Sequence, residues 1–128
     1  FLVPELGKGG DRAREIKNFH ITAVALRYLN MLLDYPLLVN YEGLQVRVPE
    51  PATFALHKLI ISARRLNKEK QKSDLETSVG LLDFIYSRPN EVKRIKSILK
   101  ALPKKWLETI LAISKKHSPN LNQIAENL

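Results

Sequence analysis

Apolar residues recur every three or four positions through most of the second half of the chain, which is the period of an α-helix. The segment from Pro51 to about Leu66 is apolar on nearly every side, so it predicts a helix at the centre of the core. Asn67–Lys72 is a polar break or a weak helical turn. Further helices are predicted over residues 75–86, 92–106 with continuation to 114, and 121–128, with Pro103 kinking a helix or starting a new one.

The first half of the chain carries a different pattern. Leu37–Tyr41 and Leu44–Val48 flank Glu42-Gly43, and a two-residue connection containing glycine favours a β-hairpin. The second arm alternates apolar and polar residues, which predicts a half-buried strand. A short helix is predicted over Ala23–Leu33, because its apolar residues recur at helical spacing.

The N-terminal residues complete the predicted fold. Phe1–Pro4 resembles the end of a strand, and Glu5–Lys17 is expected to be a mobile polar loop. We therefore predict a predominantly helical α+β fold, in which a β-hairpin and a remnant strand pack on a C-terminal bundle of four to six helices. Residues 1–50 would form the end of a sheet domain and residues 51–128 a helical domain. Because the chain opens on Phe1 rather than Met, we expect a further portion upstream.

Composition narrows the class of protein. With 128 residues and 45% apolar content the chain can bury a core of its own. It contains no cysteine, which excludes disulfides and thiol nucleophiles and fits a cytoplasmic location. Its apolar runs are far shorter than the roughly 20 residues that span a bilayer.

The positive charge is concentrated in one part of the chain. Residues 1–50 hold six Lys/Arg and six Asp/Glu, whereas residues 51–128 hold fifteen and seven, so the second part carries the whole formal charge of +8. A one-sided positive field favours polyanions such as nucleic acid, nucleoside triphosphates or acidic surfaces. It does not discriminate among them.

Lys58 is the most unusual residue of the predicted central helix, because its neighbours three and four positions away include Phe54 and Ile61. It either extends its ammonium group from the core to water or points into an anionic site. Asp74 is its candidate partner if the next helix returns antiparallel. Alternatively, Asp74 belongs to a capping box in which Ser73 is the N-cap and Glu76 the N3 residue.

Two further groups of basic residues are candidates for binding phosphate or an acceptor. The first lies at the end of the central helix, and the second lies along one face of a later helix. In both cases the alternative is an ordinary solvated helix surface. The candidates are Arg64, Arg65 and Lys68 in the first group, and Lys93, Lys96 and Lys100 in the second.

Several familiar sites are missing from the sequence. Gly7-Lys8-Gly9-Gly10 does not have the spacing of a P-loop or a dinucleotide-binding motif. No pair of closely spaced carboxylates provides a two-metal site, and the three histidines are too scattered to form a metal motif. We therefore predict no metal ligands in this chain.

The stretches Val46–Ile60, Arg64-Arg65 and Lys70–Leu75 resemble a known family. They are similar to the C-terminal half of minimal, bacterial nucleotidyltransferase-like proteins, which share the polymerase-β-type fold and are distantly related to abortive-infection toxins. The resemblance covers about residues 1–106, and its most specific part is the proline followed by Phe54–Leu59.

The resemblance implies a transfer reaction in which Mg²⁺ and a nucleoside triphosphate are held by a Gly-Ser motif and carboxylates. None of these residues occurs at the matching positions, and the third carboxylate would lie just before Phe1. Lys58 would contact the triphosphate and Asp74 would pair with it or orient it. This chain alone would be inactive. The acceptor would be RNA or another molecule. The alternative function is a non-catalytic basic module that binds nucleic acid or an acidic protein.

Overall fold

The computed structural model describes residues 2–4, 13–26 and 28–128. Its N-terminal part is a three-stranded sheet of order β1-β3-β2, formed by β1 (Leu2–Pro4), β2 (Ala13–Ile16) and β3 (Ile21–Leu26). The central strand β3 runs parallel to β1 and antiparallel to β2. A 3-10 turn, η1 (Lys17–Phe19), joins β2 to β3. The strand predicted at the start of the chain is confirmed.

The sheet corrects two predictions. The helix predicted over Ala23–Leu33 is wrong in its first half, where β3 lies, and right only for α1 (Leu29–Leu33). Of the predicted loop, residues 5–12 lie outside the described residues, and residues 13–16 form β2. The apolar spacing suggested a helix, but β3 is a strand because it has hydrogen-bonding partners on both sides.

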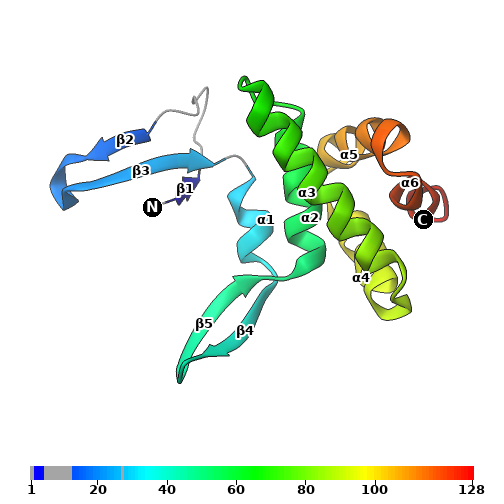
Figure 1. Cartoon of the computed structure of the whole chain (residues 1–128), viewed down its shortest axis with the longest axis horizontal. Coiled ribbons are helices and arrows are strands. Elements are labelled where there is room, and N and C mark those ends of the chain that lie inside the picture. Colours follow the sequence, from blue (N-terminus) through cyan, green and yellow to red (C-terminus); the bar gives the residue numbers. More distant parts are fainter. Residues whose placement is uncertain (1, 5–12, 27) are drawn as a thin grey trace.

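The predicted hairpin is confirmed as β4 (Pro36–Tyr41) and β5 (Leu44–Pro49). Its turn residues Glu42 and Gly43 both have positive φ, 50° and 82°, as a type I′ turn requires. The prediction of a half-buried second strand is wrong for Leu44 and Val46, which are 68% and 41% exposed. The hairpin projects from the helical part, so most of its side chains lack a surface to cover them (Figure 1).

Five helices follow the hairpin: α2 (Pro51–Ser62), α3 (Lys68–Tyr86), α4 (Pro89–Ala101), α5 (Lys104–His117) and α6 (Pro119–Glu126). Proline occupies the first position of α2, α4 and α6, where its missing N–H costs no hydrogen bond. Pro103 precedes α5 and so starts a new helix. Helix α2 ends before Leu66. Of the two alternatives for Asn67–Lys72, the polar break is wrong and the helical turn is right for residues 68–72, because Asn67 caps α3 by accepting a hydrogen bond from the Lys70 amide.

Helix α2 is the centre of the core, as predicted, and the other helices surround it (Figure 1). Helix α3 runs back antiparallel along α2. Near one end the Gln71 amide donates to the Ser62 carbonyl, and further along the Ser78 hydroxyl donates to the Ala55 carbonyl. The core is one cluster of side chains drawn from α1 to α6: Met31, Ala52, Ala55, Leu56, Leu59, Ile60, Leu82, Ile85, Ile95, Ile98, Leu99, Ile110, Leu121, Ile124 and Ala125.

The predominantly helical α+β fold is thereby confirmed. Among the described residues, no helix combines the length and the apolar character that crossing a membrane would require.

Candidate active site

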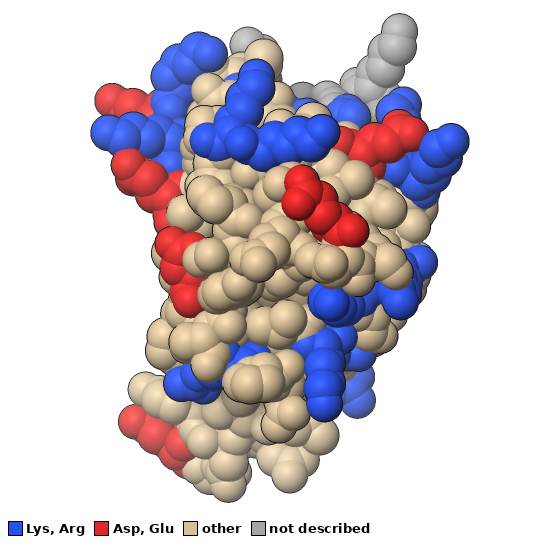
Figure 2. All heavy atoms as spheres, turned by 90° about the vertical axis from the view of Figure 1, so that its right-hand side faces the viewer, with Lys and Arg blue, Asp and Glu red and all other residues tan. Residues whose placement is uncertain are grey.

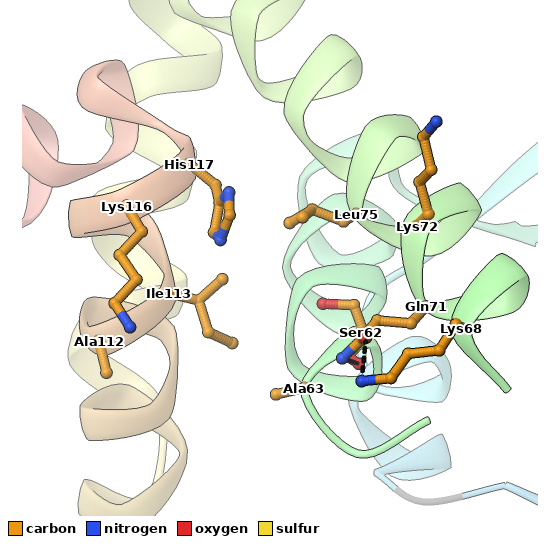
Figure 3. A pocket seen from close by; sticks show the side chains of 10 residues that line it. All are labelled: Ser62, Ala63, Lys68, Gln71, Lys72, Leu75, Ala112, Ile113, Lys116 and His117. Atoms are coloured by element: carbon orange, nitrogen blue, oxygen red, sulfur yellow. Dashed lines mark hydrogen bonds between the residues drawn. The ribbon is translucent and has the colours of Figure 1, made fainter. Parts of the chain in front are cut away.

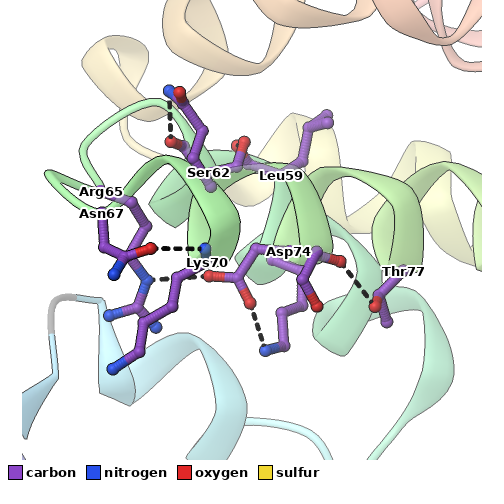
Figure 4. A network of polar contacts seen from close by, with 10 residues as sticks. Leu59, Ser62, Arg65, Asn67, Lys70, Asp74 and Thr77 are labelled. Atoms are coloured by element: carbon purple, nitrogen blue, oxygen red, sulfur yellow. Dashed lines mark hydrogen bonds and ion pairs between the residues drawn. The ribbon is translucent and has the colours of Figure 1, made fainter.

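Lys58, Asp74 and Arg65 form a cluster between α2 and α3. Lys58 Nζ lies 2.5 Å from Asp74 Oδ1, and Arg65 Nε lies 2.8 Å from Asp74 Oδ2. Each carboxylate oxygen therefore accepts a hydrogen bond from a different cation (Figure 4). Two cations and one anion give the cluster a formal charge of +1.

The antiparallel return of α3 creates this cluster. Lys58 lies on α2, and Arg65 follows the C-terminal end of that helix, seven positions later. Asp74 lies in the second turn of α3, so the capping-box interpretation is wrong: Asn67 is the N-cap, and Ser73 lies inside the helix. The Asp74 side chain is free to face α2 because it has no capping role.

Asp74 is a buried carboxylate that stays ionised. Its side chain is only 8% exposed. Burial raises its pKa, but the hydrogen bonds and charges of Lys58 and Arg65 outweigh burial, so the pKa lies below its ordinary value. An ionised carboxylate with both oxygens engaged is a poor general acid and a poor general base. Its chemistry here is to hold two cations in place.

Lys58 is the member of the cluster that reaches solvent most readily, with 25% of its side chain exposed. Its ammonium lies 5.6 Å from the centroid of the Phe54 ring, one helical turn earlier, and hydrogen-bonds Asp74. An ammonium group has three N–H donors, so this arrangement leaves donors for a further anion. A fixed cation of this kind can stabilise phosphate charge.

Arg64 and Lys68, the other candidates near this end of α2, are not brought to Asp74. The Arg64 guanidinium lies 5.6 Å from the centroid of the Tyr28 ring. Tyr28 in turn makes an edge-to-face contact with Trp106, with ring centroids 4.5 Å apart. Lys68 makes one long hydrogen bond, 3.5 Å, to Gln71. Whether these residues bind phosphate stays a prediction.

Lys93, Lys96 and Lys100 lie on α4, separate from the Lys58–Asp74–Arg65 cluster. Lys93 and Lys100 are exposed, and the Lys96 ammonium donates to the Asn127 carbonyl at 3.4 Å. Basic side chains elsewhere are also unevenly distributed. In Figure 2 they gather across the upper end of one face, with a few acidic side chains at its edges and below.

Sequence reasoning missed the partner of Arg65, although a signal was present: Arg65 follows Lys58 by seven positions, which is about two turns of a helix. It also missed the ion pair between Arg94 and Glu50, in which the Arg94 Nε lies 3.0–3.1 Å from both carboxylate oxygens. The hydrogen bond to Glu50 raises the pKa of Arg94, because it favours the charged guanidinium. These residues are 44 positions apart, so no local pattern could pair them.

The described residues do not fit a magnesium site. Within residues 2–4, 13–26 and 28–128, no three His, Cys, Asp or Glu side chains are grouped so that they could hold a metal ion. Of the buried carboxylates, Asp74 already binds two cations and Glu50 binds Arg94. No step of a reaction can therefore be assigned to a metal held by these residues.

Comparison with known family models places the chain in a family. A family model described as nucleotidyltransferase matches residues 1–100, which is most of the chain and includes Lys58, Arg65 and Asp74. The chain belongs to this nucleotidyltransferase family. Comparisons with curated proteins and with solved structures found no match.

Membership of the nucleotidyltransferase family supports nucleotidyl transfer as the type of reaction and a nucleoside triphosphate as the class of substrate. The match ends at Lys100 and so includes α2, α3 and most of α4 but not α5 or α6. The cluster of Lys58, Asp74 and Arg65 thus lies in the part of the chain that this nucleotidyltransferase shares with its family.

Proposed function

We propose that this protein takes part in the transfer of a nucleotidyl group from a nucleoside triphosphate to an acceptor, and that Lys58 contacts the triphosphate. In such a transfer a nucleophile of the acceptor attacks the α-phosphorus, the bond from that phosphorus to the pyrophosphate oxygen breaks, and negative charge develops on the departing pyrophosphate. A fixed ammonium beside the phosphates lowers the energy of that charge.

The observation that carries the proposal is the position of the Lys58 ammonium. Asp74 and the Phe54 ring hold it in place, and part of its side chain stays exposed. Arg65 supplies the second cation for Asp74, so the carboxylate does not cancel the positive charge of the cluster. In this proposal, Asp74 and Arg65 position Lys58 rather than touch the reacting atoms.

The proposal assigns the metal chemistry to other residues. Mg²⁺ is the expected partner of the triphosphate, and the carboxylates that bind it would come from outside the described residues. By this proposal the described residues bind phosphate and position it but do not complete the transfer alone. RNA is one candidate for the acceptor.

A Lys58→Ala change in the full-length protein tests the proposal. We expect transfer from a γ-³²P-labelled triphosphate, read as release of labelled pyrophosphate, to fall at least about a hundredfold, the size of effect seen when one charge-stabilising donor is lost. Lys105→Ala, which removes an exposed lysine from α5, should keep the parent rate. Circular dichroism at the assay temperature checks that both variants are folded. A folded Lys58→Ala variant with the parent rate would rule out the role.

One observation favours the second function, a basic module that binds nucleic acid or an acidic protein. Helix α4 buries Ile95, Ile98 and Leu99, while Lys93 and Lys100 remain exposed. Replacing Lys93, Lys96 and Lys100 by Gln should weaken binding to single-stranded RNA and reduce its salt dependence. Unchanged binding and unchanged salt dependence would remove α4 as the binding surface.

A further inference from the structure

A cleft of about 450 Å³ lies between the start of α3 and the end of α5, with the C-terminal end of α2 at its base. Volumes in this range are typical of sites for small ligands. Figure 3 shows its two walls, with the Ile113 and Leu75 side chains directed into the space between them. The ten described lining residues are Ser62, Ala63, Lys68, Gln71, Lys72, Leu75, Ala112, Ile113, Lys116 and His117.

The charged groups of this α3–α5 cleft are all basic, because no Asp or Glu is among the residues that line it. Lys68 comes from α3 and Lys116 from α5, so cations stand on both walls (Figure 3). Lys116 has no hydrogen bond or ion pair within the described part of the chain, and Lys68 makes only the long contact to Gln71. Lys72 points away from the cleft and lies 3.7 Å from Glu76.

The rest of the lining suits a ligand that has a flat or apolar part as well as negative charge. Ala63, Leu75, Ala112 and Ile113 give the cleft an apolar surface. The His117 ring lies between the two walls in Figure 3, where it can contact a planar group. A nucleotide has both a negatively charged phosphate and a flat base. An acidic peptide offers carboxylates but not the same combination of phosphate charge and planar ring.

We propose that the α3–α5 cleft binds a nucleotide unit, with Lys68 and Lys116 at its phosphate. The unit is either a free nucleotide or one nucleotide of a single strand. Asp74 and Lys58 do not line the cleft, so the site does not depend on the proposed role of Lys58. The cleft would therefore be a second nucleotide-binding site, separate from Lys58.

The test compares two double variants that lose the same charge. Lys68→Gln/Lys116→Gln removes one cation from each wall of the cleft, and Lys104→Gln/Lys105→Gln removes two exposed lysines at the other end of α5. Binding of AMP is measured by calorimetry, and binding of a fluorescein-labelled ten-nucleotide oligo(A) RNA by anisotropy at several salt concentrations. Inorganic phosphate serves as the ligand without sugar or base.

We expect the cleft variant to bind the RNA or AMP at least about tenfold more weakly. The slope of log K against log salt for RNA should fall by about 0.7, since a single strand contributes about 0.7 per phosphate contact. The control variant should stay within about twofold of the parent. AMP binding identifies a free nucleotide as ligand, and binding of RNA alone identifies a strand. Equal losses in both variants, phosphate binding as tight as AMP binding, or no binding to the parent would each overturn the proposal.

Discussion

Replacing Asp74 by Asn removes the negative charge that Lys58 and Arg65 share while keeping the size of the side chain. Hydrogen bonds to charged groups contribute about 1.5–3 kcal/mol each, and Asp74 accepts two of them. Lys58 and Arg65 are 25% and 19% exposed, so water screens part of this interaction. We therefore expect the free energy of unfolding at pH 7 to fall by about 2 kcal/mol, below the 3–5 kcal/mol typical of a fully buried pair.

The loss should depend on pH in a direction fixed by the lowered pKa of Asp74. A carboxyl whose pKa is lower in the folded state than in the unfolded state stabilises the fold above its unfolded value, about 3.9. That contribution disappears as the pH falls through the lower, folded-state pKa. The parent and Asp74→Asn should therefore differ most near neutral pH and approach each other in acid.

Urea unfolding followed by circular dichroism, repeated from pH 7 down to about pH 2.5, measures both effects. Glu76→Gln is the matched control, because it makes the same chemical change two residues along α3 at an exposed site and should cost less than about 0.5 kcal/mol. A loss below about 0.5 kcal/mol for Asp74→Asn at pH 7 would refute the reasoning. So would a difference from the parent that does not shrink in acid.

Three further changes test other parts of the fold by the same unfolding assay. Arg94→Met should lower the free energy of unfolding by about 1–2 kcal/mol, because it leaves the mostly buried Glu50 carboxylate without its partner. An unchanged free energy of unfolding would show that the ion pair does not stabilise the fold. Gly43→Ala should lower the free energy of unfolding by about 1 kcal/mol, because the φ of 82° is strained for alanine although an added Cβ meets no atom. Amide exchange of the hairpin should then become faster. Leu99 is fully buried, so Leu99→Ala should lower the free energy of unfolding by about 2–5 kcal/mol. Leu66 is 87% exposed, so Leu66→Ala should change it by no more than about 0.5 kcal/mol. Equal effects of the two variants would contradict the placement of the core.

The sequence alone determined the features that depend on local chemistry. Pro51, Pro89 and Pro119 start helices because their fixed φ suits the first turn and their missing N–H has no partner to lose. The hairpin was predictable from Glu42-Gly43 because the turn needs positive φ at both positions. Apolar spacing was enough to place α2 at the centre of the core. The family resemblance was also readable from the sequence, because its motif is contiguous.

The tertiary structure determined the features that depend on contacts between residues far apart in the chain. Ile21–Leu26 is a strand because β1 and β2 lie on either side of it, which no window of local sequence reveals. Asp74 looked like part of a helix cap, yet it faces α2, because α3 begins six residues earlier at Lys68. Lys58 and Arg65 both reach the buried Asp74 carboxylate only once α3 folds back along α2, and that return turns three separate charges into a candidate site.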